Sequence, residues 1–473
     1  MIVDESHRFR NPRTRRYRQL APWLEDRRTL LVTATPVVNR LADLLHQLLL
    51  GVRDDVLLPE GVPSLRALLG GGQGSSALGR LVIEHCSVEA RPERRERASP
   101  PMPEEAVGAE QALELLDRLR LSRSPPVASL VRSVLRHAAG SSPAALLGAL
   151  RRYRSLLLHA RDALAAGRPM DRSAIRRFTG EGSDQLFWWE LLPASDAAME
   201  LELADLDVVD SVLAAARSLG EQPDGKVERL GALLSDGAPT LIFAARRETV
   251  RYLRDRLGDS RLAWCTGERA GLGAAVVPRP TVLSWFRSGP DAAAAERMNV
   301  KHLVVTDVAA EGLDLQRAGR VIHYDLPWTP MRLDQREGRA VRLGSLHDHV
   351  EVVRFTLPRA LERALRVEEA LRRKRLLPDT AGLGIGGRGL WRWRTELAEA
   401  MEGGEATSGV AIAQAQPPGL LAGFSIRASR DGADSPMAFV LLWMDREGRT
   451  TECEDTVGAR LSAAVAAEAG QAD

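Results

Sequence analysis

The sequence predicts an α/β protein with parallel sheets in two segments, a helical insertion between them and a small β-rich domain near its C-terminal end. Short apolar runs alternate with helical patterns over residues 1–50 and again over 224–376, which is typical of a doubly wound parallel sheet. Between these segments, residues 51–220 carry apolar residues at helical spacing. Three strand-like runs between residues 419 and 455 then predict an antiparallel meander.

The first segment predicts two strands, at Met1–Val3 and Thr29–Thr33, followed by a helix over Asn39–Leu50. In the insertion, a charged, Pro-rich connector over Arg91–Pro103 precedes helices at Ala106–Leu121, Val127–His137, Ala144–Ala165 and Ala194–Leu219. The second segment predicts strands at Thr240–Ala244, Leu262–Cys265, His302–Thr306, Val321–Tyr324 and Val350–Phe355.

We therefore expect a chain of several domains. They are a partial first α/β lobe at 1–50, the helical insertion at 51–220, a complete second lobe at 221–376, a linker with a short helix at 377–418, and a β-rich domain with a tail at 419–473.

Composition excludes several classes of protein. The net charge is +2, so no strong basic field by itself indicates nucleic-acid binding. Three scattered cysteines form neither a disulfide framework nor a metal cluster. No apolar stretch approaches the roughly 20 residues that span a bilayer, and the N-terminus carries no secretion signal. We expect a cytoplasmic protein that has no membrane partner.

The first chemical motif is Asp4-Glu5-Ser6-His7, directly after an apolar strand. Ligands of α/β proteins bind at the carboxyl ends of the strands. In nucleotide hydrolases, an Asp at such a strand end lies near Mg²⁺ and a neighbouring residue orients or deprotonates the attacking water. Taken alone, so short a string fits a solvated turn equally well.

A second motif, Thr33-Ala34-Thr35-Pro36, also lies at a strand end. Its two hydroxyls are suited to link the acidic site with whatever binds the nucleic acid. The alternative is a helix cap, with Thr35 as the N-cap and Pro36 at the first helical position.

The most specific segment is 306–344, which contains E-G-L-D-L-Q, Y-D-L-P-W-T-P and Q-R-E-G-R-A-V-R-L-G. Arg339 and Arg342 are three residues apart, so we expect them to share a helix face. Two guanidiniums on one face can reach a polyphosphate across a cleft, and such an arginine finger raises the rate about 10³–10⁵-fold. A charge-rich solvated helix is the alternative.

In this order, the motifs resemble those of superfamily 2 helicases. They are most similar to the Swi/Snf-like branch, which includes bacterial ATPases that act on RNA polymerase complexes. Residues 1–50 and 224–356 carry the resemblance, which implies two RecA-like lobes, a partial first and a complete second. One departure is Ser345, where Swi/Snf proteins usually have Gln.

The resemblance implies ATP and Mg²⁺ as cofactors and double-stranded DNA as a partner, together with RNA polymerase or another DNA-bound protein. Asp4 would bind Mg²⁺, and the catalytic residues would be Asp4, Glu5, Arg339 and Arg342. The nucleotide would be bound by His7, Gly312, Asp314 and Gln335. Thr33 and Thr35 would couple hydrolysis to movement, and the nucleic-acid backbone would meet Thr266, Gly267 and Thr306.

Such motors need a P-loop, G-x-x-x-x-G-K-[ST], ahead of the acidic motif. Lysine occurs only at positions 226, 301 and 374, and only Gly220–Lys226 has the required glycine spacing. That stretch lacks the final hydroxyl, and Pro223 would remove an amide from the phosphate cradle. We interpret it as the start of the second lobe.

A first lobe with two strands leaves buried edges unpaired. We therefore expect a fragment of a longer motor, which arises either from a misplaced start or from a split gene whose partner polypeptide supplies the upstream strands. Two alternatives stay open. One is a non-catalytic scaffold that binds DNA or RNA polymerase, and the other is an RNA helicase, which fits the D-L-P-W-T-P segment less well.

Overall fold

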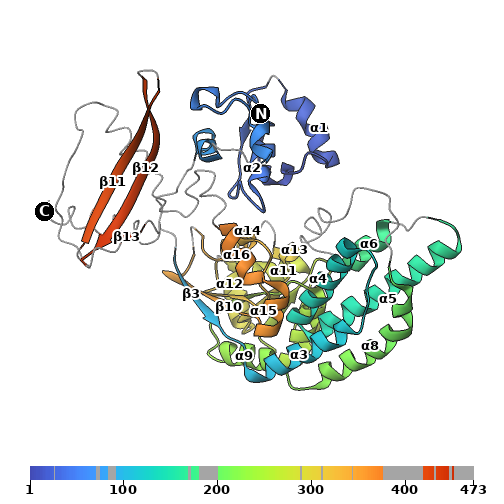
Figure 1. Ribbon diagram of the computed structural model, residues 1–473. Coiled ribbons are helices and arrows are strands. Elements are labelled where there is room, and N and C mark those ends of the chain that lie inside the picture. The colour runs from blue at the N-terminus through green and yellow to red at the C-terminus, as the bar shows by residue number, and fades with distance from the viewer. Residues whose placement is uncertain are drawn as a thin grey trace. The chain divides into compact units, whose positions relative to one another are not determined.

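The computed structural model describes residues 1–25, 27–70, 75–83, 92–168, 172–179, 201–287, 290–310, 313–342, 345–375, 419–430, 433–446 and 450–451. The chain divides into two compact units, one formed by Met1–Ser87 with Arg373–Asp473 and the other by Val88–Arg372. Figure 1 shows the helices and strands of each unit. Residues 88–220 thus share a compact unit with the predicted second lobe, whereas the predicted insertion began at residue 51.

The N-terminal part of the first unit holds a short parallel sheet of β1 (Ile2–Val3) and β2 (Leu30–Leu31). Helix α1 (Arg15–Leu24) connects the strands, and α2 (Leu41–Leu48) follows them. Apolar residues of α1 recur at helical spacing and pack against Val3, Leu31 and Leu50. Short 3₁₀ turns complete this part at Ser6–Phe9, Leu58–Glu60, Arg66–Gly70 and Ser75–Leu81.

The C-terminal part of the first unit is an antiparallel meander, as the sequence predicts. It consists of β11 (Gly419–Arg430), β12 (Ala433–Asp445) and β13 (Thr450–Thr451). The short helix predicted within 377–418 lies outside the described residues.

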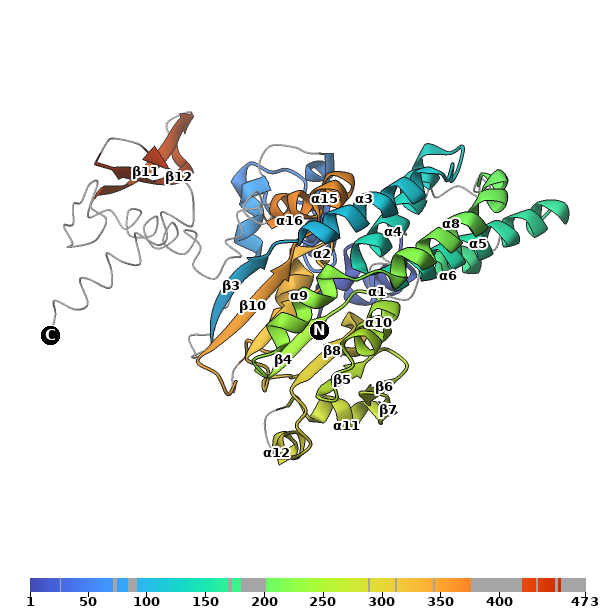
Figure 2. The same cartoon turned by 90° about the horizontal axis from the view of Figure 1, so that it is seen from below.

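The second unit is built on one mixed sheet, in which the described strands have the order β3-β10-β9-β4-β8-β5-β6-β7. Six strands are parallel, namely β3 (Glu93–Ser99), β10 (His349–Phe355), β9 (Arg320–His323), β4 (Thr240–Phe243), β8 (His302–Val305) and β5 (Leu262–Cys265). Two short antiparallel strands, β6 (Ala270–Leu272) and β7 (Ala275–Val276), end the sheet opposite β3 (Figure 2). All five strands predicted for the second lobe are therefore confirmed.

Both faces of this sheet are covered, as expected for parallel strands. On one face, Ile242 packs with apolar residues of α9 (Gly225–Leu234) and α10 (Arg247–Leu257). On the other, Leu241 packs with α11 (Arg279–Ser284), α12 (Pro290–Arg297) and α13 (Asp307–Ala310). The central strands β4, β5 and β8 are buried along their whole length. The fold is therefore a doubly wound, RecA-like lobe.

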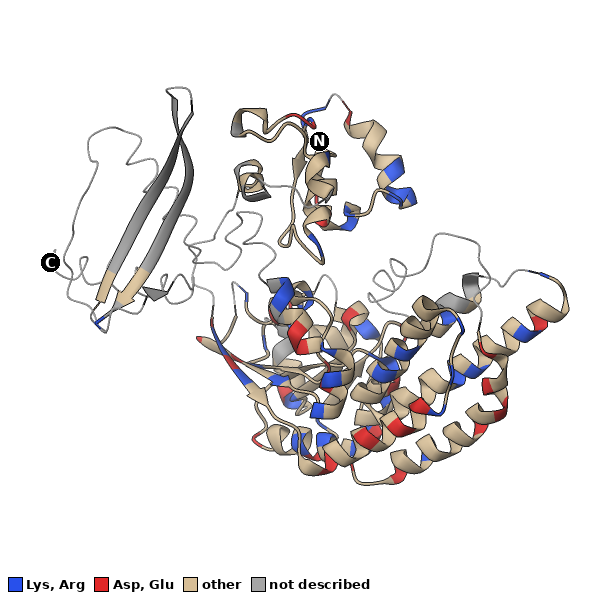
Figure 3. Cartoon of the chain, in the orientation of Figure 1, with Lys and Arg blue, Asp and Glu red and all other residues tan. Residues whose placement is uncertain are grey.

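The helical region of this unit consists of α3 (Pro103–Asp117), α4 (Pro125–Ser141), α5 (Pro143–Ala165), α6 (Arg172–Thr179) and α8 (Leu206–Glu221). Four of these helices, α4, α5, α6 and α8, bury a shared apolar core that also includes residues of α3. Positive and negative side chains are interleaved over the helices of the second unit (Figure 3). In the part of the chain that the structure describes, no helix is both long and apolar enough to cross a membrane.

Buried polar side chains join this helical region to the lobe. Ser141 Oγ donates a hydrogen bond to Asp325 Oδ2 at 2.7 Å, and the Ser142 and Thr249 hydroxyls are 2.9 Å apart. Buried polar groups without partners are costly, so a satisfied cluster specifies one docking geometry.

One sequence-based expectation is wrong. The connector predicted over Arg91–Pro103 contains β3, a seven-residue edge strand that pairs in parallel with all of β10. Its charged composition is unusual for a strand but suits an edge, where charge discourages association with other chains. Propensity alone gave no strand here because its partner lies about 250 residues further along the chain.

Candidate active site

The acidic pair lies in a sharp turn after β1. Asp4 and Glu5 are both exposed, and Glu5 has a left-handed backbone with φ 50° and ψ 46°. Residues other than glycine rarely adopt this conformation, and those that do gather at functional sites. Asp4 Oδ1 accepts a hydrogen bond from Glu5 N–H at 2.8 Å. Both carboxylates therefore lie at the carboxyl end of the strand.

His7 connects the acidic turn with the second motif. Its Nδ1 lies 3.1 Å from Glu5 Oε2 and 3.1 Å from Thr33 Oγ1. Burial, together with the charges of Arg10 and Arg8, lowers the pKa of His7 to about 4. The imidazole is therefore neutral at neutral pH, so its contact with Glu5 is not an ion pair, whereas its contact with Thr33 is a hydrogen bond.

Thr33 and Thr35 lie in the turn after β2. Thr35 N–H donates to Thr33 Oγ1 at 3.1 Å, whereas the buried Thr35 Oγ1 has no hydrogen-bond partner among the described residues. The alternative that Thr35 caps a helix is wrong, because α2 begins at Leu41 with Arg40 as its N-cap. The Asp43 carboxylate instead accepts the N–H groups of Asn39 and Arg40 at the start of that helix.

This part of the site suits Mg²⁺ in one particular way. The described residues contain no group of three or more His, Cys, Asp or Glu arranged to hold a metal. Mg²⁺ commonly uses one or two carboxylates and completes its shell with water and substrate phosphates. The exposed carboxylate of Asp4 fits that mode of binding.

The prediction that Arg339 and Arg342 share a helix face is wrong. Both residues belong to the motif at 335–344, which is called the arginine segment below. Helix α14 (Pro330–Glu337) ends before both arginines, with Gly338 as its C-cap. Arg339 and Arg342 lie on the turns that follow, where Arg342 N–H donates to Ala340 O at 3.0 Å. A glycine at the cap ends the regular helix, so the three-residue spacing no longer sets the direction of the two side chains.

The two arginines nevertheless contact one short segment. Arg339 Nη1 donates to Leu313 O at 3.3 Å, and Leu315 N–H donates to Arg339 O at 2.8 Å. Arg342 forms an ion pair with Asp314, and both of these side chains are half exposed. Asp314, Arg339 and Arg342 are therefore gathered in one place. Gln335 lies on α14 one turn before Arg339, and Gly312 lies outside the described residues.

Helix α14 is held by a buried ion pair that the sequence analysis missed. Arg336 Nε and Nη2 donate to the two oxygens of Asp307 at 2.5 and 2.8 Å, and Arg336 Nη1 donates to Asp325 O at 2.7 Å. Burial raises the pKa of Asp307, but the charge and hydrogen bonds of Arg336 outweigh burial and lower it. A bidentate pair of this kind fixes the relative orientation of the two side chains and also adds stability.

Glu337, the next residue, is buried in a second charged cluster. Its carboxylate accepts from Arg94 at 2.6 Å, from His323 at 3.0 Å and from Arg354 at 3.2 Å. Burial raises the pKa of Glu337, but the His323 hydrogen bond and the charges of Arg94 and Arg354 outweigh burial and lower it to about 2. Arg336 and Glu337 lie inside the recognised motif, a signal that sequence reasoning could have used. Arg94 had no such signal.

Lys226 has no role in a phosphate cradle here. Its Nζ donates to Gly140 O at 2.8 Å and contacts Asp325 Oδ1 at 3.2 Å, and it lies 4.0 Å from the centre of the Tyr324 ring. Asp224 caps α9 by accepting the N–H groups of Lys226 and Val227. This lysine therefore joins the helical region to the second lobe.

The predicted nucleic-acid contacts lie at the ends of neighbouring strands. Thr266 follows β5 and Thr306 follows β8, and Thr306 N–H donates to Cys265 O at 3.2 Å. Both threonines are buried, and Thr266 Oγ1 donates to Arg269 O at 2.9 Å within its own turn. The exposed group at this position is the backbone of Gly267.

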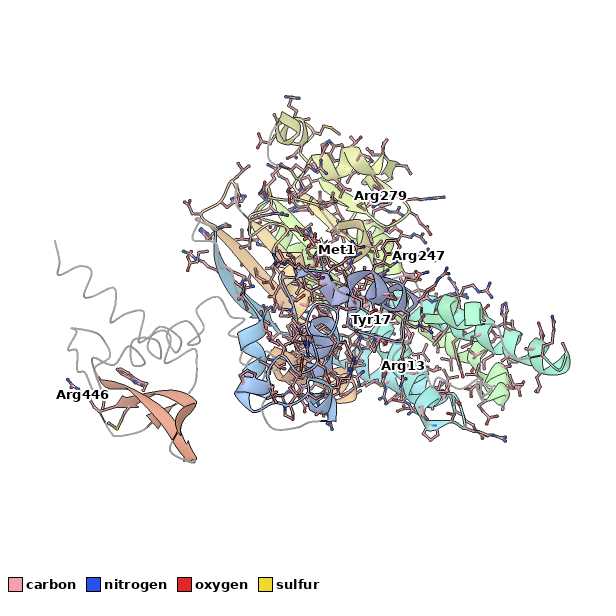
Figure 4. All side chains as sticks on the ribbon, turned by 90° about the horizontal axis from the view of Figure 1, so that it is seen from above. Met1, Arg13, Tyr17, Arg247, Arg279 and Arg446 are labelled. Atoms are coloured by element: carbon pink, nitrogen blue, oxygen red, sulfur yellow. The ribbon has the colours of Figure 1, made fainter. Side chains whose placement is uncertain are left out.

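Two arginines that the sequence analysis did not single out bind the same turn. Arg279 Nη1 donates to Gly267 O at 2.8 Å, and Arg247 contacts Glu268 at 2.9 Å. These residues begin α11 and α10, and both are labelled in Figure 4. Arginines beside an exposed turn are the usual means of binding nucleic-acid phosphates.

Two protein families match the chain. Residues 1–58 match the SNF2-related domain, and residues 225–344 match the helicase conserved C-terminal domain. The second match begins at Gly225, the first residue of α9, and includes the complete arginine segment.

Curated relatives match over short stretches. An uncharacterized ATP-dependent helicase, YqhH, of Bacillus subtilis is 48% identical over 52 residues, 11% of this chain and 9% of the relative. The RNA polymerase-associated protein RapA of Erwinia tasmaniensis is 29% identical over 130 residues, 26% of this chain and 12% of the relative. RapA of Cronobacter sakazakii is 28% identical over 148 residues, 30% and 14% respectively. The chain thus matches less than one sixth of each relative's length.

Among solved structures, the C-terminal part of the Fun30 ATPase domain is similar at 14% identity, with a TM-score of 0.29 over 62% of this chain and 97% of that chain. The sheet order and the two family matches identify the fold without that weak similarity. The acidic motif lies inside one matched domain and the arginine segment inside the other, so the two matches support a Swi/Snf-like helicase of superfamily 2.

Proposed function

We propose that this chain supplies the acidic half of an ATPase site and the arginine-bearing lobe of a motor. The motor moves on double-stranded DNA and remodels protein–DNA complexes. The observation that carries the proposal is the arginine segment. Arg339 contacts Leu313 and Leu315, and Arg342 contacts Asp314 between them, next to a helix held by two charged clusters. Such pre-organisation is what stabilisation of a phosphoryl transition state requires.

Each motif has a separate role in this proposal. Asp4 would hold Mg²⁺, which would neutralise charge at the phosphates, and Glu5 would orient or deprotonate the attacking water. His7 links Glu5 with Thr33, since its Nδ1 contacts both side chains. Thr33 and Thr35 couple hydrolysis to movement, and the buried Thr35 hydroxyl has no hydrogen-bond partner among the described residues.

In the second lobe, Gln335, Arg339 and Arg342 contact the γ-phosphate, and Gly312 and Asp314 line the nucleotide site. Asp314 forms an ion pair with Arg342, so a γ-phosphate at this arginine competes with the Asp314 carboxylate. The Thr266–Gly267 turn and Thr306 meet the DNA backbone, with Arg247 and Arg279 adding positive charge.

Partners follow from the relatives and from the sequence. RNA polymerase is proposed because two relatives carry the name RNA polymerase-associated protein. A P-loop polypeptide is proposed because the chain contains no G-x-x-x-x-G-K-[ST] string.

ATP hydrolysis tests the proposal. We would measure it for the chain alone and for the chain co-expressed with the polypeptide encoded directly upstream, each with and without double-stranded DNA. Activity should appear in the co-expressed sample and rise with DNA. Glu5→Gln and Arg339→Ala should each lower kcat about 10³-fold or more. Arg359→Ala, at an exposed position of α15 (Arg359–Leu365), is the control. Full activity in both site variants would contradict the proposal.

A second candidate function is a non-catalytic module that binds DNA or RNA polymerase. It is favoured by the role of Lys226, whose ammonium contacts two backbone carbonyls and Asp325 rather than an open loop. Salt-dependent DNA binding without hydrolysis in either sample would favour this candidate.

A further inference from the structure

The chain enters the second compact unit immediately before β3. The boundary between the units lies between Ser87 and Val88, and β3 spans Glu93–Ser99. The strand forms the edge of the sheet and pairs with β10 along its whole length (Figure 2). One of the two chain crossings between the units therefore leads into β3, and the other lies between Arg372 and Arg373, within α16 (Val367–Arg375).

Successive side chains of a strand point to opposite faces of the sheet. On one face, Arg94 contacts Glu337 and Glu96 contacts Arg354. On the other face, Arg97 contacts Glu351, and Arg95 pairs with Glu93 of its own strand. Among the residues that the structure describes, only the first face of β3 therefore reaches α14.

Arg94 is the longest-range partner of Glu337. Its Nη1 lies 2.6 Å from Glu337 Oε2 and 3.6 Å from Asp334, and its Nε lies 3.1 Å from Glu96. The Glu337 side chain is only 1% exposed, so its charge depends on these partners rather than on water. Arg94 thereby ties the edge strand to the last turn of α14.

Glu337 in turn holds the backbone that carries Arg339. Its carbonyl oxygen accepts the N–H groups of Ala340 at 3.0 Å and Val341 at 2.8 Å. A displacement of Glu337 would therefore move the turn between Arg339 and Arg342. Misplacing a reacting group by about 1 Å can cost about 10²-fold in rate.

We propose that Arg94 is a positioning residue for the arginine segment, and that β3 fixes the position of Arg339 through the Arg94–Glu337 pair. The importance of Arg339 for hydrolysis rests on the proposed function. The mechanical link itself does not, because it concerns only contacts within the second unit.

Two measurements on the whole chain test the link without any need for activity. The first is amide hydrogen exchange in residues 330–342 of Arg94→Ala, for which loss of a charge-assisted bond predicts exchange about tenfold or more faster. The second is an NMR titration of the His323 ring, which shares the Glu337 carboxylate. Without Arg94, that carboxylate acts more strongly on His323, so the titration midpoint should rise by about one pH unit.

The matched control is Arg95→Ala, which removes the same side chain from the opposite face of the same strand. It should leave both measurements unchanged. Arg94→Lys keeps the charge, so it should restore the His323 midpoint while leaving part of the faster exchange, because lysine lacks the guanidinium fork. If Arg94→Ala and Arg95→Ala speed exchange equally along the whole sheet, Arg94 only stabilises the strand and the link does not exist.

If the completed motor hydrolyses ATP, Arg94→Ala should lower kcat and leave KM unchanged. Faster exchange together with normal kcat would overturn the positioning role and leave the proposed function intact. If the completed motor without any substitution hydrolyses no ATP, the proposed function is wrong. The exchange measurement still tests the link between Arg94 and the arginine segment.

Discussion

The two predicted halves of the site differ in how the protein holds them. The acidic turn follows β1, a two-residue strand in which Ile2 is 73% exposed, and it is arranged by neighbours such as Thr33 and Gln47. The arginine segment belongs to the second unit, in whose central sheet Ile242 is fully buried. Its helix is held by Asp307, His323 and Arg354 and by the distant Arg94. A few hydrogen bonds suffice to shape a turn, whereas buried charges need a complete lobe around them.

Replacing an isoleucine by alanine in β4 and in β1 should show the largest difference in stability between the two regions. Ile242→Ala should lower the free energy of unfolding of the second unit by about 2–5 kcal/mol, because it leaves a cavity in a packed core. Ile2→Ala should change stability by less than about 0.5 kcal/mol. The free energy of unfolding of each unit is measured by urea denaturation, with amide hydrogen exchange as the probe. Equal losses at the two positions would mean that β1 is as well packed as β4.

A second pair compares the two glutamates. Glu337→Gln should cost about 3 kcal/mol, because it leaves Arg94 and Arg354 without their buried anion. Glu5 is 48% exposed, so Glu5→Gln should cost less than about 0.5 kcal/mol. Urea midpoints of the two variants would show whether the ranking holds, and a larger loss for Glu5→Gln would reverse the comparison.

Lowering the pH should lower the free energy of unfolding of both units, and that of the second unit more than that of the first. Burial lowers the pKa of His7 in the first unit, and of His302 and His323 in the second, to about 4. The unfolded value is about 6.5, so the unfolded chain binds more protons and stability falls as the pH drops from about 6.5 towards 4. Between pH 7.5 and 5.5 each group should cost about 1 kcal/mol.

Unfolding free energies over this range would test that difference in pH dependence. His7→Asn should remove the slope of the first unit and leave that of the second unit unchanged. A slope that persists in this variant would assign the dependence to another group.

Several features of the fold could be read from local patterns. The strands β4, β5, β8, β9 and β10 are short apolar runs bounded by polar residues, and burial on both faces makes such runs recognisable. Asp314, Arg339 and Arg342 were recognised from their spacing in a family motif. Arg336 and Glu337 lie inside that motif but were missed, because a charged residue gives no sign of being buried.

The sequence by itself determined the α/β class, the motif residues and the place of the second lobe, since these depend on period and spacing along the chain. Only the tertiary structure decided that Glu93–Ser99 is an edge strand, that α14 ends before both arginines and that Arg94 reaches Glu337. Each of these depends on partners brought together by folding. A charged side chain is stable in the interior only where such partners satisfy it.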